Sequence, residues 1–127
     1  MKKYILIFVA LFILAVSHFS FVYAADLEAS GKIEDGVRVI EVKASQFKFQ
    51  PDPIVVKLGE KVKLVVTSAD VTHGLAIGEF KVNLTIPTQE TKTVEFIADQ
   101  AGSFRVFCSV YCGSGHTHMQ AKLIVQK

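Results

Sequence analysis

The stretch Cys108-Ser-Val-Tyr-Cys112-Gly-Ser-Gly-His116-Thr-His118-Met119 lies near the end of the 127-residue chain. It places two thiols, an imidazole and a thioether at the spacing C-x3-C-x3-H-x2-M. Thiolate and thioether are soft ligands that select Cu(I), and imidazole also suits copper. Because a thioether is a poor ligand for zinc, calcium and magnesium, Met119 points to copper. The spacing suits either one metal bound by the last three donors or two metals bridged by the thiolates.

Strand-like alternation flanks this loop on both sides. Phe104 and Val106 lie on the same face of a strand as Cys108. After the loop, every second residue from Met119 to Val125 continues the apolar face. We therefore expect the loop to connect two consecutive strands at one end of a β frame, which would hold the donors rigidly.

The rest of the chain from residue 37 onward also has the texture of an all-β domain. Val62, Leu64 and Val66 share one apolar face, and Phe47 and Phe49 alternate with polar residues. No stretch shows a convincing helical period. Candidate strands separated by turn signals occupy residues 37–44, 46–50, 54–58, 61–68, 91–98, 103–108 and the segment after 119. This pattern predicts an antiparallel β-sandwich over residues 37–127.

The first 25 residues are predicted to be a targeting segment. Two lysines precede an unbroken apolar run at 4–16, and Val22-Tyr23-Ala24 offers a small-residue cleavage site. Residues 4–25 are also long enough to cross a bilayer core of about 30 Å as an N-terminal helix. Both interpretations export the domain, and the short apolar core favours cleavage. The polar residues 26–36 are predicted to be a linker.

The charge balance argues against nucleic-acid binding. The chain has 14 Lys and Arg against 12 Asp and Glu. Without Lys2 and Lys3 the two classes are equal, and the remaining basic residues are scattered singly. No nucleic-acid partner is therefore expected. About one hundred residues are enough for one small domain with a modest core.

The loop motif, together with Asp70-Val71-Thr72-His73-Gly74, resembles the binuclear CuA site of cytochrome c oxidase subunit II and nitrous-oxide reductase. The fit is best to the short, single-anchor subunit II of ba-type oxidases, whose loop also reads YCG-x-GH-x-x-M. The resemblance covers roughly the last two-thirds of the chain. It implies a cupredoxin-like Greek-key β-sandwich as the fold.

The resemblance also implies a set of copper ligands. Cys108 and Cys112 would bridge two copper ions, and His73 and His116 would each bind one of them. The two coordination spheres would be completed by the remaining donors, which are Met119 and the main-chain carbonyl of Val110.

The function implied by the resemblance is electron transfer. The protein would receive electrons from cytochrome c or a similar donor and pass them to the catalytic subunit of a haem-copper oxidase. It would act in the periplasm or on the outer face of the cytoplasmic membrane, where residues 4–25 would anchor it if they are retained. Because protein ligands would saturate the metals, we expect no catalysis by the chain alone.

Two positions depart from the oxidase pattern. Leu75 stands where oxidase subunits usually carry an aromatic residue near the point of electron entry, and the chain has no Trp. Val110 can offer a carbonyl but lacks the carboxylate that a Glu would add there. We expect copper binding to survive both changes.

Three alternatives remain open at this point. The cysteines could form a disulfide, as exported cysteine pairs often do. A mononuclear blue-copper protein could use His73, Cys112, His116 and Met119. A copper chaperone or sensor could hold Cu(I) at a more exposed site. His118, which alternates with Met119, is predicted to face solvent.

Overall fold

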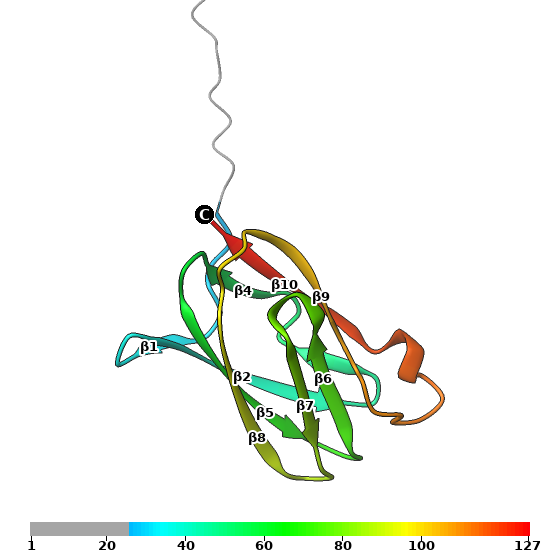
Figure 1. The fold of residues 1–127 in the computed structure, drawn as a ribbon. Helices are drawn as coiled ribbons and strands as arrows, with labels where there is room; N and C mark the ends of the chain where they lie inside the picture. Colours follow the sequence, from blue (N-terminus) through cyan, green and yellow to red (C-terminus); the bar gives the residue numbers. More distant parts are fainter. Residues whose placement is uncertain (1–25) are drawn as a thin grey trace, which may run out of the picture.

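The computed structural model describes residues 26–127, which form two five-stranded sheets packed as a sandwich (Figure 1). The first sheet has the order β1-β2-β5-β8, with β3 paired to β2, and the second has the order β4-β10-β9-β6-β7. The strands of the first sheet are β1 (Lys32–Glu34), β2 (Val37–Ser45), β3 (Lys48–Gln50), β5 (Lys61–Ser68) and β8 (Thr91–Ile97). Those of the second are β4 (Ile54–Lys57), β6 (His73–Ile77), β7 (Val82–Ile86), β9 (Gly102–Phe107) and β10 (Gln120–Gln126).

The predicted all-β architecture is confirmed. Apart from two 3-10 turns, η1 (Gly78–Phe80) and η2 (His116–His118), residues 26–127 contain no helix. The prediction of a purely antiparallel sandwich is wrong for two strand pairs, because β2 runs parallel to β5 and β4 runs parallel to β10. The physical reason is the crossover: after β3 the chain visits the other sheet as β4, so it can return beside β2 in the same direction.

The period-two pattern of the sequence produces the core. In β5, the side chains of Val62, Leu64 and Val66 have no exposed surface, whereas Lys61 and Thr67 are exposed. Burying a side chain of this size contributes about 1.5–3 kcal/mol. Both sheets contribute such rows to a single cluster of buried side chains. This core makes the sandwich a firm support for the loops at its ends.

The N-terminal part of the chain is only partly described. The predicted signal or anchor segment, 1–25, lies outside the described residues. In the predicted linker, 26–36, the exposed strand β1 pairs with β2, and Ser30 donates its main-chain N–H to the carbonyl of Val55 at 2.7 Å. From residue 26 onward no helix is both long and apolar enough to cross a membrane.

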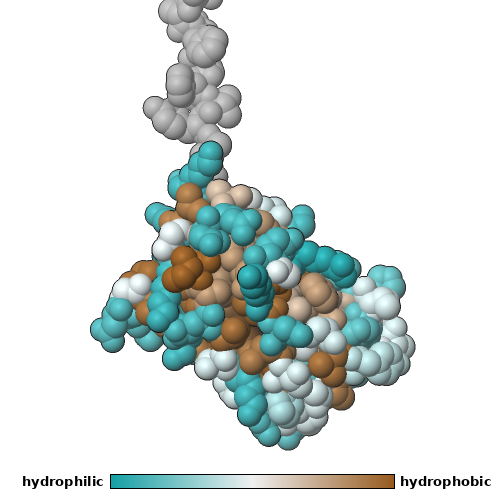
Figure 2. All heavy atoms as spheres, viewed as in Figure 1, coloured by the Kyte–Doolittle hydropathy of each residue, from teal (hydrophilic) through white to brown (hydrophobic). Residues whose placement is uncertain are grey.

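The strand register defines two opposite ends of the sandwich. At the loop end, β2 and β5 finish together and β9 passes into β10 through residues 108–119. At the linker end, β2 and β5 begin side by side, next to residues 26–36. Residues 108–119 contain no Asp, Glu, Lys or Arg. In Figure 2 the surface towards the loop end is mostly pale, of intermediate hydropathy, whereas strongly hydrophilic side chains are more frequent near β1 and the C-terminus.

Candidate metal centre

The two cysteines lie side by side and are not bonded. Cys108 follows the last residue of β9, and the chain turns back within four residues to bring the Cys112 sulfur 3.6 Å from the Cys108 sulfur. A disulfide bond would require about 2.05 Å. Both thiols are free and buried. Burial, together with the adjacent Cys108 thiol, raises the pKa of Cys112 to about 11, so in the metal-free protein Cys112 stays a thiol at neutral pH.

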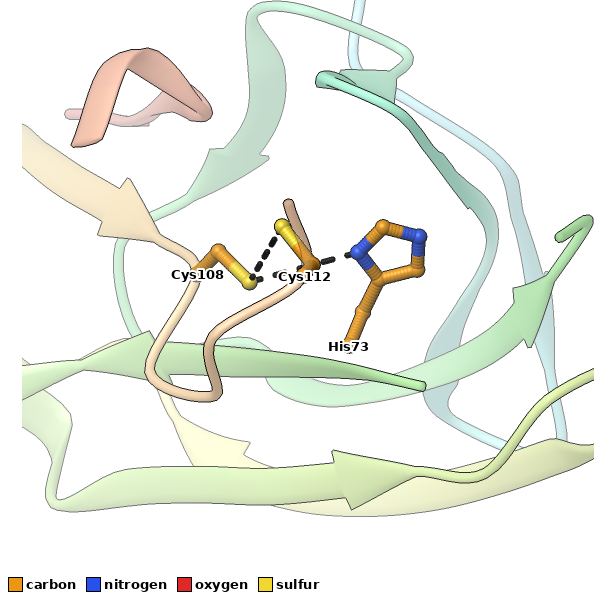
Figure 3. A group of neighbouring side chains, drawn as sticks. All are labelled: His73, Cys108 and Cys112. Carbon is orange, nitrogen blue, oxygen red and sulfur yellow. Dashed lines mark hydrogen bonds between the residues drawn. The ribbon is translucent and has the colours of Figure 1, made fainter. Parts of the chain in front are cut away.

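His73 faces the sulfur pair from β6, the strand next to β9 in the second sheet (Figure 3). It is the first residue of β6 and is completely buried. Its Nδ1 lies 4.0 Å from the Cys108 sulfur, and one ligand atom from each of His73, Cys108 and Cys112 lies within 4.8 Å of the others. These are three soft or borderline donors in one buried cluster.

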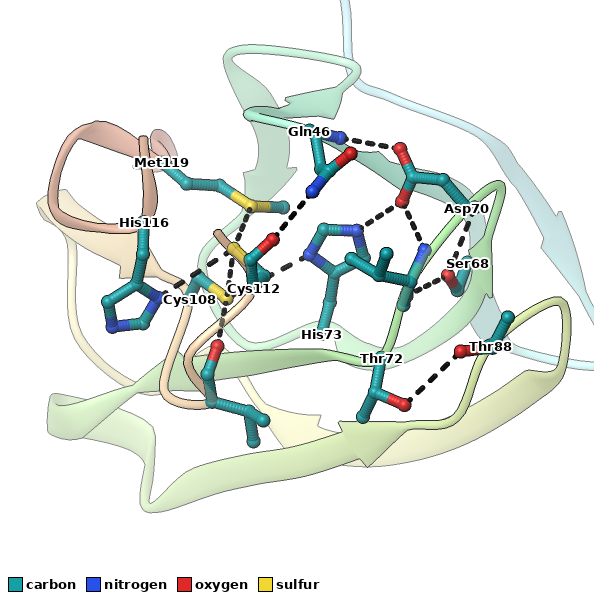
Figure 4. Close-up of polar contacts among 12 residues, drawn as sticks. Gln46, Ser68, Asp70, Thr72, His73, Thr88, Cys108, Cys112, His116 and Met119 are labelled. Carbon is teal, nitrogen blue, oxygen red and sulfur yellow. Dashed lines mark hydrogen bonds and ion pairs between the residues drawn. The ribbon is translucent and has the colours of Figure 1, made fainter. Parts of the chain in front are cut away.

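The remaining predicted donors complete this cluster (Figure 4). The Cys112 sulfur lies 3.7 Å from Nδ1 of His116 and 3.7 Å from the sulfur of Met119. The Cys108 sulfur lies 3.0 Å from the main-chain oxygen of Val110. Each thiol therefore contacts one imidazole nitrogen and one weaker neutral donor. The structure brings all six predicted donors into one region.

Two neighbouring side chains lie at the surface. His118 is exposed and its ring nitrogen contacts the hydroxyl of Thr117, which agrees with the prediction that it faces solvent. Tyr111, between the two cysteines, is 76% exposed and its ring centre lies 5.6 Å from that of His116. These aromatic rings form the outer rim of the cluster.

Asp70 stands behind His73, a role that the sequence pattern alone did not single out. Nε2 of His73 lies 2.6 Å from one carboxylate oxygen, which also accepts the Val71 N–H. Burial acts to raise the pKa of Asp70, but hydrogen bonds from the Gln46 N–H, His73 and the Val71 N–H outweigh it and hold the pKa below its ordinary value. An ionised Asp70 favours the proton on Nε2, which leaves Nδ1 free to bind a metal.

Gly74 allows the cysteine loop to approach β6 closely. A Cβ atom at this position would lie 2.2 Å from the hydroxyl of Ser109 and 2.8 Å from the main-chain nitrogen of Val110. The Gly74 N–H itself points at the Cys108 sulfur, 3.5 Å away. Only glycine fits this contact, because the backbone of the loop occupies the space of a side chain.

The donor set fits copper better than the other common metals. It combines two thiols, two imidazoles, a thioether and a carbonyl, all within a largely buried cluster. No carboxylate is among the donors, although Mg²⁺ and Ca²⁺ require oxygen ligands. Structural zinc sites take four Cys or His ligands in a closed tetrahedron and have no use for a thioether. The residues present therefore suit copper.

Comparisons with known proteins agree with this geometry. The family model of the cupredoxin-like domain matches residues 4–125. Cytochrome c oxidase subunit 2 of Thermus thermophilus is 33% identical over 88 residues, which cover 69% of this chain and 65% of that protein. Nitrous-oxide reductase of Cupriavidus necator is 32% identical over 106 residues, which cover 80% of this chain and 16% of the enzyme. The chain thus spans less than two thirds of the length of either relative.

Solved structures show the same fold. One chain of a haem-copper terminal oxidase dimer superposes with a TM-score of 0.65 at 25% identity, covering 98% of this chain and 93% of that one. The periplasmic domain of subunit II of the cytochrome oxidase of Bradyrhizobium japonicum also has a TM-score of 0.65, at 23% identity, with 70% and 83% coverage.

Proposed function

This chain belongs to the cupredoxin-like domain family, and we propose that it is an exported electron-transfer protein that binds two copper ions in a CuA-type centre. It would accept electrons from a cytochrome c or a similar donor and deliver them to a haem-copper terminal oxidase as a subunit II-like component. His73, Cys108, Val110, Cys112, His116 and Met119 are the proposed ligands.

The observation that carries the proposal is the contact between two thiols that each have their own partners. A mononuclear site would need only Cys112, His116, Met119 and His73. Cys108 would then be a surplus buried thiol, yet it lies between Cys112 and His73 and contacts both. Two thiols 3.6 Å apart, each beside one imidazole nitrogen, offer a symmetrical donor set for a pair of metals.

The chain's own residues would keep such a centre rigid. When bound, two bridged copper ions would supply a one-electron centre whose charge is shared over both metals. The sandwich holds His73 at the start of β6 and brings Met119 directly before β10, so the donors are attached to a packed core. A site that hardly rearranges between redox states favours fast electron transfer, and hydrogen bonds around the donors tune its potential.

The proposed partners rest on the similarity to oxidase subunits and on the character of the rim. The uncharged 108–119 loop with exposed Tyr111 offers a partner a surface that is easily desolvated. Leu75, at the position where oxidase subunits usually carry an aromatic residue, is completely buried. It therefore gives a redox partner no contact, and electron entry in this chain would use the Tyr111 and His116 side of the loop.

The proposed location follows from the same similarity. One superposed structure is described as the periplasmic domain of an oxidase subunit II. Together with the apolar segment at residues 4–16, this supports export to the periplasm or to the outer face of the cytoplasmic membrane. Sequencing the N-terminus of the protein recovered from cells would test cleavage before Ala25. An intact N-terminus in the membrane fraction would indicate a retained anchor.

Copper quantitation combined with EPR tests the main proposal. The loaded protein should hold two coppers per chain, and the one unpaired electron of the mixed-valence form should couple to both nuclei. One copper with a signal localised on a single nucleus would instead support the blue-copper alternative. A protein that holds copper only as Cu(I) and releases it readily to a chelator would support the chaperone or sensor alternative.

A further inference from the structure

The turn between β2 and β3 touches both halves of the candidate centre (Figure 4). The main-chain N–H of Gln46 donates to the carboxylate of Asp70 at 2.8 Å, and the side-chain amide of Gln46 donates to the main-chain oxygen of Cys112 at 2.7 Å. The other carboxylate oxygen of Asp70 is the one bonded to His73. A single residue thus connects the carboxylate behind one imidazole with the backbone of one thiol.

The same turn fits closely against the cysteine loop. A Cβ atom added to Gly113 would lie 2.9 Å from the side-chain nitrogen of Gln46, and one added to Gly115 would lie 2.3 Å from the ring of Phe47. Gly113 also has a φ of +132°, which favours glycine. The amide and the ring therefore form a surface against which residues 112–115 rest.

Cys112 depends on such a contact because no sheet holds it. Residues 108–115 lie outside the strands, so hydrogen bonds of a β ladder do not fix the carbonyl of Cys112. Cys108, in contrast, donates its main-chain N–H to the carbonyl of Met119 at 3.1 Å, as a continuation of the β9–β10 pairing. Of the two thiols, Cys112 is the one whose place relies on a side chain from outside the loop.

We propose that Gln46 is a positioning residue for the metal centre. Its main-chain N–H holds Asp70 and, through it, the orientation of His73, while its side-chain amide holds the backbone of Cys112. The two halves of the donor set are thereby kept in one fixed relation. This inference rests on the proposed copper centre and names a residue outside its ligand set.

Two substitutions remove the side-chain bond and leave the main-chain bond to Asp70 in place. Gln46→Ala removes the amide, and Gln46→Glu keeps the length but, when ionised, has no proton to donate to the Cys112 carbonyl. Loss of such an outer hydrogen bond typically weakens metal binding about 10- to 100-fold. We expect both variants to release copper to a chelator at least tenfold faster than the wild type and to show a changed EPR spectrum. Gln100→Ala, at an exposed turn between β8 and β9, is the matched control and should change neither.

A second measurement uses the metal-free protein. The His116 N–H donates to the carbonyl of Gly113 at 3.1 Å, so its hydrogen exchange reports whether the loop is held in place. We expect this exchange to be about fivefold faster in Gln46→Ala, the factor for one net hydrogen bond, with unchanged exchange in the paired strands β2 and β5. If the variants merely lowered the melting temperature, with wild-type spectra, release rate and loop exchange, Gln46 would be an ordinary turn residue. Wild-type protein that bound a single copper would overturn the two-copper proposal, while the loop exchange would still decide the role of Gln46.

Discussion

The two ends of the sandwich differ in what holds them together. At the loop end, the two thiols, His116 and Met119 meet through sulfur contacts of 3.6–3.7 Å, which are weak interactions. At the linker end, Nε and Nη2 of Arg38 donate to the two carboxylate oxygens of Glu60, at 2.9 and 2.7 Å. The contacts among these sulfur, imidazole and thioether donors contribute little stability, whereas Arg38 and Glu60 are joined by charge-assisted hydrogen bonds.

The difference shows where each end obtains its geometry. Arg38 also donates to the carbonyl of Ser30, and Glu60 also accepts the Lys57 N–H at 2.9 Å, so these charges stabilise each other without a ligand. At the loop end, outer contacts from Asp70, Gln46 and Gly74 shape a site whose donors would gain their strong bonds only from a metal. Metal binding should therefore stabilise the protein chiefly from the loop end.

The largest expected effects come from replacing either of the two shared thiols, and Cys108→Ser is the sharper test. We predict that this variant loses one copper and behaves as a mononuclear centre, because Cys112, His116, Met119 and His73 remain. Copper quantitation and EPR would show one metal per chain and a signal localised on one nucleus. Two coppers with an unchanged spectrum would show that the bridging assignment is wrong. Cys112→Ser should be more damaging, since it removes the thiol shared by both alternatives.

Gly74→Ala should be the most damaging change that leaves every donor in place. The added methyl group would meet loop backbone at 2.8–2.9 Å, so the loop must move away from β6. Overpacking of this kind costs about 1–3 kcal/mol. Urea unfolding of the metal-free protein would measure this cost, and copper titration would show weakened binding.

Gly78→Ala is the matched control for that substitution. Among the described residues, apart from its two chain neighbours, no atom lies within 4 Å of a Cβ at this position, so the change in unfolding free energy should stay within about 0.5 kcal/mol. Equal effects of the two alanines would contradict the argument that the close approach at Gly74 matters.

Glu60→Gln tests the linker end and should leave copper binding unchanged. Removing the charge leaves the part-buried Arg38 with a poorer partner, which should cost about 1–3 kcal/mol of unfolding free energy. Glu95→Gln, which breaks the exposed pair with Lys61, is the control and should have little effect. Loss of copper in Glu60→Gln would show that the two ends are coupled.

The stability of the linker end should also depend on pH. The hydrogen bond from Arg38 lowers the pKa of Glu60 below its ordinary 4.5, although burial opposes this shift. The folded state thus binds the proton less well than the unfolded state, so the stabilisation is full above pH 4.5 and is lost as the pH falls through the lowered pKa. Between about pH 5 and 3, the unfolding free energy of Glu60→Gln should fall less steeply than that of the wild type. Parallel curves would contradict this.

The smallest effect is expected from Met119→Leu. The side chain is completely buried and Leu has a similar volume, so stability should change by less than about 1.5 kcal/mol. A thioether is a weak neutral ligand that tunes the potential more than the affinity. Both coppers should remain while voltammetry shows a shifted reduction potential. His118→Ala, at the exposed rim, should change neither the copper content nor the reduction potential. An equal shift of the potential in both variants would argue against ligation by Met119.

The sequence predicted a large part of this arrangement because the relevant signals are local. Alternating residues in β5 and β10 identify their buried faces, since side chains point to opposite sides of a strand. The loop spacing brings Cys108, Cys112, His116 and Met119 together because few residues separate them. The residue type of His73 was visible, but its assignment depended on family resemblance, since 34 residues lie between His73 and Cys108.

What the sequence by itself determined, then, is an all-β domain with a copper-suited donor loop between its last two strands. The tertiary structure alone decided which outer residues hold those donors. Asp70 precedes His73 by three residues and could have been suspected, but Gln46 lies 66 residues from Cys112 and carries no sequence signal. The parallel pairing of β2 with β5 was equally hidden, because a crossover leaves no periodicity in the chain. Such contacts form only when separate strands pack on one core, and a pattern read along the chain does not contain that information.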